Sequence, residues 1–156
     1  MAIIVNVINA TRLRRVPTDE QFRSWVGAAL RPRKKGVVDI RIATLDEIAA
    51  LNQQYRAISR PTNVLAFPAD IPDCIDYPLL GDLVICAEVV RQESSRQRKT
   101  ENAHWAHLTI HGTLHLIGHD HQKDDEAKVM EALETRILHK LGHSDPYQNY
   151  QARIGA

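Results

Sequence analysis

The sequence is poor in cysteine and contains no long apolar run. Its two cysteines, Cys74 and Cys86, form no Cys-x-x-Cys pair. That argues against a disulfide framework and against a thiol redox motif, so we expect both to be inert. No apolar run approaches the roughly 20 residues of a membrane-spanning helix. Residues 1–6 lack the basic segment and the long apolar core of a secretory signal. These absences predict a cytoplasmic protein with no membrane association.

The sequence also lacks an excess of charge of either sign. It has 20 basic and 19 acidic residues and a net charge of +1, so total charge does not indicate nucleic-acid binding. The distribution is uneven, however, with basic clusters at 12–15, 31–35 and 96–99 and acidic clusters at 70–76 and 124–126. On one face of the folded chain, the basic clusters could contact phosphates. For any single cluster, a solvated loop or helix end is the simpler interpretation.

The pattern of apolar residues predicts one α+β domain over residues 1–156, with a frayed tail after about residue 146. Short β-branched or alternating runs predict strands at 3–8, 37–43, 64–67 and 81–86. Capping boxes beginning at Thr18 and Thr44 predict two helices. Further helices are expected at about 87–97, after Thr100, and from about Asp124. We therefore expect a small mixed sheet packed with about five helices, in the order β-α-β-α-β-β-α-α-α.

Six of the eight histidines lie between residues 101 and 121. His111 and His115 are one helical turn apart, so both rings can reach one ion. Gly118 can end the helix in a left-handed conformation, and His121 can then complete a triad. Three neutral imidazoles and no cysteine are typical of a catalytic zinc site, which keeps one position open for water and lowers its pKa to roughly 7. His119 is the alternative third ligand, but the spacing favours His121.

The spacing is that of the metzincin motif HExxHxxGxxH, with one change. Gly112 stands where a metalloprotease has its general-base glutamate. The spacing therefore favours a metal site at the end of a central helix, whereas the missing carboxylate argues against peptide hydrolysis by that route.

The residues around the triad are more ambiguous. His107 can lie behind the ligands or simply pack in the core, and packing is the simpler interpretation, whereas His104 is expected at the surface. His139 and His143 suit a helix C-terminus and need no further role. Asp120 could orient an imidazole or cap the turn.

Residues 111–121, His-Gly-Thr-Leu-His-Leu-Ile-Gly-His-Asp-His, resemble the HGxLHLxGYDH signature of the YbeY family of bacterial endoribonucleases. Residues 61–68, Pro-Thr-Asn-Val-Leu-Ala-Phe-Pro, resemble the family's PTNVLSFP segment, and Gly81-Asp82 also matches. Ala66 and His119 depart from the family's serine and tyrosine. The resemblance implies a single-strand-specific endoribonuclease with one zinc ion per chain. It also implies action on ribosomal RNA, notably the 3′ end of the small-subunit RNA, in ribosome quality control and in contact with the ribosome.

The resemblance also matches Arg56 to the family's functional arginine. A guanidinium near a metal site can hold a phosphate through two hydrogen bonds and offset developing charge. Arg56 could instead interact with a helix dipole, and Arg60 is a nearby alternative. We expect His111, His115 and His121 to hold Zn²⁺ while Arg56 binds the phosphate. Two other functions remain open from sequence: a metal hydrolase of another substrate class, and a ribosome-assembly module with a structural zinc.

Overall fold

The computed structural model describes residues 2–72 and 78–147. Nine elements follow one another in the described part of the chain: β1 (Ile3–Asn9), α1 (Asp19–Leu30), β2 (Gly36–Ala43), α2 (Leu45–Arg56), β3 (Val64–Pro68), β4 (Leu79–Cys86), α3 (Ala87–Arg96), α4 (Glu101–Leu116) and α5 (Asp124–Lys140). This order confirms the predicted α+β class. Cys74 and nearly all of the tail expected to fray lie outside the described residues, whereas Cys86 is a buried free thiol.

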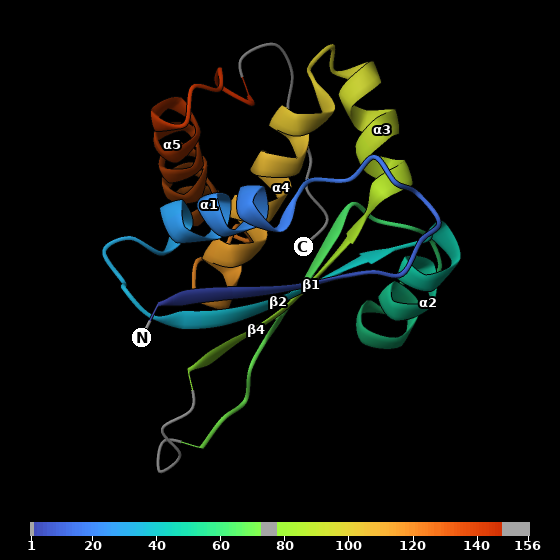
Figure 1. Ribbon diagram of the computed structural model, residues 1–156, viewed down its shortest axis with the longest axis horizontal. Helices are drawn as coiled ribbons and strands as arrows, with labels where there is room; N and C mark the ends of the chain where they lie inside the picture. The colour runs from blue at the N-terminus through green and yellow to red at the C-terminus, as the bar shows by residue number, and fades with distance from the viewer. Residues whose placement is uncertain (1, 73–77, 148–156) are drawn as a thin grey trace.

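The four strands form one mixed sheet in the order β1-β2-β4-β3 (Figure 1). β1 and β4 both pair with β2 in parallel, and β3 pairs antiparallel with β4. β3 is therefore an edge strand, as the prolines at 61 and 68 indicate, because proline cannot donate to a central ladder.

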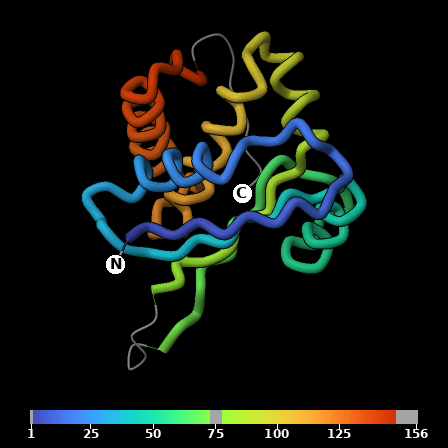
Figure 2. The backbone as a smooth tube through the Cα atoms, viewed as in Figure 1, coloured from blue at the N-terminus to red at the C-terminus, as the bar shows by residue number. Residues whose placement is uncertain are grey.

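The main core lies between one face of the sheet and helices α1, α4 and α5 (Figure 1). Alternate strand residues such as Ile40, Leu83 and Ile85 point into it. From β1 the chain turns back above the sheet into α1, which packs across α4 (Figure 2). α4 is buried along most of its length, and it contacts both β3 and β4. This burial makes α4 the rigid element on which the histidines are mounted.

The other face of the sheet is partly covered by α2, over a smaller cluster that includes Ile48, Val84 and Cys86. Thr44 caps α2 by accepting from the Glu47 backbone. The expected reciprocal capping bond is replaced, because the Glu47 side chain pairs with Arg41 at 2.8 Å. Helical spacing from Ile48 and Leu51 predicts Tyr55 on the apolar face of α2. The structure differs, because Tyr55 is 59% exposed and packs only edge-on against Phe67.

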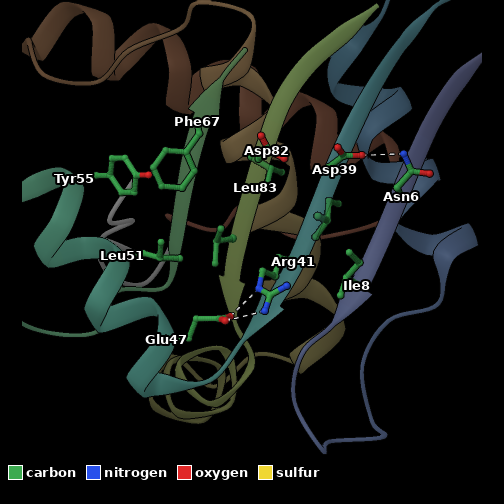
Figure 3. Close-up of a pocket in the computed structure, with 12 residues that line it drawn as sticks. Asn6, Ile8, Asp39, Arg41, Glu47, Leu51, Tyr55, Phe67, Asp82 and Leu83 are labelled. Atoms are coloured by element: carbon green, nitrogen blue, oxygen red, sulfur yellow. Dashed lines mark hydrogen bonds and ion pairs between the residues drawn. The ribbon is translucent and has the colours of Figure 1, made fainter. Parts of the chain in front are cut away.

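Beyond α2, the second face of the sheet is an open groove (Figure 3). Its floor combines apolar side chains, including Ile8 and Val84, with Asp39 and Asp82. Asn6 donates to Asp39 at 2.8 Å. The pKa of Asp82 is raised by partial burial and by the neighbouring Asp39 charge. The histidines of α4 lie across the sheet from this groove. Among the described residues, no helix is both long and apolar enough to cross a membrane.

Candidate metal centre

The C-terminal end of α4 reverses the chain as the sequence predicts. The amide of His119 donates to the carbonyl of Leu114 and that of Gly118 to the carbonyl of His115, which together form a Schellman motif. Gly118 has a φ of +101°, a conformation that glycine adopts without the steric cost of a Cβ. The side chain of Asp120 then accepts from the backbone amide of His121 at 2.7 Å. Of the two roles left open for Asp120, this contact is the turn cap.

This turn places His121 beside the two histidines of the helix. The rings of His111, His115 and His121 form a triangle with centroid separations of 4.7, 5.1 and 4.9 Å. One ring nitrogen from each lies within 4.8 Å of the other two. Nε2 of His111 and Nε2 of His115 are 3.1 Å apart. His119 does not belong to this group. The structure thus brings together the three residues that the spacing selected, in an arrangement that can bind a metal ion.

The electrostatic environment of His115 favours the neutral imidazole. Burial, together with the neighbouring His111 and His121, lowers the pKa of His115 to about 4. A neutral imidazole offers a lone pair, which is the form that ligates a metal. The cluster is therefore ready to bind a cation at neutral pH without first losing protons from His115.

Behind the triad lies a buried polar group that sequence analysis missed. Glu134 of α5 is fully buried, and its Oε1 accepts a hydrogen bond from Nδ1 of His111. Its Oε2 accepts from the Tyr147 hydroxyl and lies 3.3 Å from Nε2 of His107. Burial tends to raise the pKa of Glu134, but the hydrogen bonds from His107 and His111 outweigh it and lower that pKa overall. Glu134 is therefore a buried carboxylate in contact with a candidate ligand.

Burial also changes the pKa values of His107 and Tyr147, the two other residues that contact Glu134. Desolvation lowers the pKa of His107 to about 4 despite the nearby carboxylate. The pKa of Tyr147 is raised by burial and by the charge of Glu134. His107 is thus neutral and buried behind the triad, in contact with Glu134. A role for His107 in support of the ligands stays a prediction. A sequence signal for Glu134 did exist, because it interrupts the apolar stripe of α5 four residues after Met130.

The prediction that His104 lies at the surface is wrong, because its side chain is only 1% exposed. Its Nε2 lies 2.8 Å from Oε1 of Glu93 on α3, and Asn63 donates to the same oxygen at 3.1 Å. Burial lowers the pKa of His104. This second histidine–glutamate pair joins α3, α4 and the segment before β3, two helical turns from the triad.

Arg56 is the last residue of α2 and is exposed. Ala57 follows in a left-handed conformation that ends the helix. Arg56 thus lies at the C-terminal end of α2 and is not one of the three residues of the histidine cluster.

Comparisons with known proteins show which family this chain is similar to. The family model described as Endoribonuclease YbeY matches residues 7–142. The chain is 49% identical to the Endoribonuclease YbeY of Nitrosococcus oceani over 152 residues, which is 96% of this chain and 99% of that protein. It is also 49% identical to that of Cellvibrio japonicus over 136 residues, covering 86% of this chain and 77% of the relative. The solution structure of TM1509 from Thermotoga maritima shares the fold, with a TM-score of 0.60 and 24% identity over 93% of this chain and 99% of that one.

Proposed function

Because this chain belongs to the endoribonuclease YbeY family, we propose that it matures ribosomal RNA in the cytoplasm. As a family member it is a nuclease that cleaves RNA phosphodiester bonds. The specific proposal is a zinc-dependent, single-strand-specific enzyme that processes the 3′ end of the small-subunit RNA and acts in ribosome quality control. The observation that carries the metal-dependent part is the convergence of three imidazole nitrogens within 4.8 Å at the end of α4.

The donor set of the site fits zinc. Imidazole suits several divalent metals, but three histidines without cysteine are typical of catalytic zinc with one position open. In the proposal, His111, His115 and His121 hold one ion per chain. A bound zinc ion would act as a Lewis acid on a phosphoryl oxygen and would lower the pKa of a water molecule. The three histidines are half-buried or buried, so the surrounding core would hold their rings in place around a bound ion.

Arg56 is proposed to bind the scissile phosphate. A guanidinium can donate two parallel hydrogen bonds to phosphate oxygens, and it keeps its positive charge at any physiological pH. Its exposure at the end of α2 leaves it accessible to a long substrate. Arg60, which follows in the same loop, is the alternative. The basic clusters at 12–15, 31–35 and 96–99 would contact the RNA backbone and make binding weaken as salt rises.

The test compares variants from parallel purifications. His115→Ala is expected to lose bound metal and cleavage together while remaining folded. Arg56→Ala is expected to keep its fold and metal but to cut a precursor of the small-subunit RNA poorly. Arg23→Ala, at an exposed position on α1, removes the same charge as a control, and His139→Ala on α5 does the same for a histidine.

The measurements are metal content, circular dichroism and single-turnover cleavage of the precursor. Because a contaminating ribonuclease would be equal in all preparations, only a difference between variants counts. Full cleavage by metal-depleted His115→Ala would contradict the metal-dependent mechanism. Full cleavage by Arg56→Ala would remove Arg56 from it.

A further inference from the structure

We infer that Glu134 is the positioning residue of the metal centre, holding His111 in the one tautomer and orientation that point Nε2 at the ion. This inference rests on the proposed function, because it assumes that the triad binds a metal. It concerns a residue from a different helix, 23 positions beyond His111 in the chain. Three contacts of Glu134 and its complete burial support it.

The first contact determines where the hydrogen of His111 lies. A carboxylate has only acceptors, whereas a neutral imidazole carries one N–H and one lone pair. Since Oε1 of Glu134 faces Nδ1 of His111, Nδ1 carries the hydrogen and Nε2 carries the lone pair. Nε2 of His111 lies 3.1 Å from Nε2 of His115, so that lone pair points into the cluster. Metal-ligating histidines characteristically donate their other N–H to a carboxylate or carbonyl in this way.

The other two contacts hold the carboxylate itself. Oε2 accepts from the Tyr147 hydroxyl and lies 3.3 Å from Nε2 of His107. Three donors thus converge on two oxygens. A glutamine at this position would replace one acceptor oxygen with an NH₂ group, which would face donors. The surroundings are therefore built for a carboxylate rather than for an amide of the same shape.

The charge of Glu134 points to the same role. Its side chain is fully buried, and in the described part of the chain the groups within ion-pair distance are the imidazoles of His107 and His111. A buried carboxylate is costly unless positive charge compensates it. A divalent cation on the far nitrogen of His111 would supply that compensation, and the carboxylate would in turn make His111 a more basic ligand.

The experiment measures metal affinity directly. Zn²⁺ and Co²⁺ dissociation constants are determined by chelator competition for the wild type and for Glu134→Gln, which keeps the shape and removes the charge. We expect about 10–100-fold weaker binding in Glu134→Gln, the range typical when such a partner of a ligand is changed. The Co²⁺ absorption bands should also shift, because His111 loses its fixed orientation. A residue that only stabilised the fold would leave those bands unchanged.

The matched control is Glu93→Gln. Glu93 pairs with His104 on the same helix α4 but does not touch the triad, so its variant should bind both metals within about twofold of the wild type. Glu134→Asp keeps the charge and shortens the side chain, and it serves as the second variant if Glu134→Gln does not fold. It should also weaken binding, because the carboxylate no longer reaches Nδ1 of His111.

The outcomes separate the two proposals. If the wild type binds no stoichiometric metal, the proposed function fails at its first step. If the wild type binds metal and the folded Glu134 variants bind it with the affinity and spectrum of the wild type, the role of Glu134 is overturned while the metal centre stands. Equal weakening in Glu93→Gln would also overturn it, since the effect would then belong to α4 in general.

Discussion

Gly112 faces the side chains of Leu83 on β4 and Val64 on β3. Replacing it with alanine tests whether the packing of α4 on the sheet has room for a side chain there. A Cβ built at this position would lie 2.8 Å from Cδ2 and 3.3 Å from Cδ1 of Leu83, and 3.4 Å from Cγ2 of Val64. Both neighbours are fully buried. Gly27, in the middle of α1, has nothing within 4 Å of its own built Cβ. The two positions thus offer the same substitution with and without a packing conflict.

The magnitudes follow from two opposing effects. Alanine is favoured over glycine in a helix interior by about 0.8–1.0 kcal/mol, so Gly27→Ala should be stabilised by nearly that amount. Gly112→Ala gains the same helix propensity, but adding a methyl group to a packed core typically costs about 1–3 kcal/mol. The free energy of unfolding of Gly112→Ala should therefore lie about 1–3 kcal/mol below that of Gly27→Ala.

Urea unfolding in the presence of a chelator measures this difference, because chelation keeps metal binding out of the comparison. Equal stabilisation of the two variants would refute the packing argument. The same geometry bears on the protease-like spacing, since glutamate at position 112 would need far more room than alanine. We expect Gly112→Glu to be destabilised well beyond Gly112→Ala and to gain no peptidase activity.

Three further predictions concern stability, pH and chemistry. Thr100 caps α4 by accepting from the amide of Ala103 at 3.0 Å, so Thr100→Ala should lose about 1 kcal/mol in urea unfolding; an unchanged midpoint would mean that the cap is dispensable. Burial lowers the pKa of His104, and the positive charges of Lys99 and Arg96 act in the same direction. The hydrogen bond to Glu93 raises this pKa but does not offset the burial. As pH falls, His104 is therefore protonated in the unfolded chain before it is protonated in the folded protein. The free energy of unfolding should begin to decrease as pH drops below about 6.5. His104→Gln should make that part of a urea–pH series less steep, whereas the contributions of His107 and His115, whose pKa values are lowered to about 4, should remain. Finally, if the 2′-hydroxyl of RNA is the nucleophile, a DNA analogue of the substrate should resist cleavage, whereas similar rates on both would indicate attack by water.

Local sequence signals predicted most of the fold. Helix caps at Thr18, Thr44 and Thr100 and the β-branched runs located seven of the nine described elements. The other two, α3 and α5, were also predicted in their correct places in the order. These signals succeeded because each depends on residues within a few positions of one another, where propensity and capping act directly. The prediction that Tyr55 is buried on α2 was wrong, because helical spacing alone does not show how far a short sheet extends beneath a helix.

In the candidate site, too, the residues that depend on local spacing could be predicted, and those that depend on tertiary packing could not. His111, His115, Gly118 and His121 could be assigned from spacing, because one helix and its terminating turn place all three rings. His104 and Glu134 could not, since each takes its role from another helix that reaches it only through tertiary packing. A carboxylate within the apolar stripe of α5 nevertheless carries information, because burying a charge is expensive and such a residue persists only where it has donors to satisfy it. In this fold those donors are a candidate ligand, a second histidine and a tyrosine. An acidic residue on a core-facing helix position therefore points to the polar site that the helix packs against, even before the partner is known.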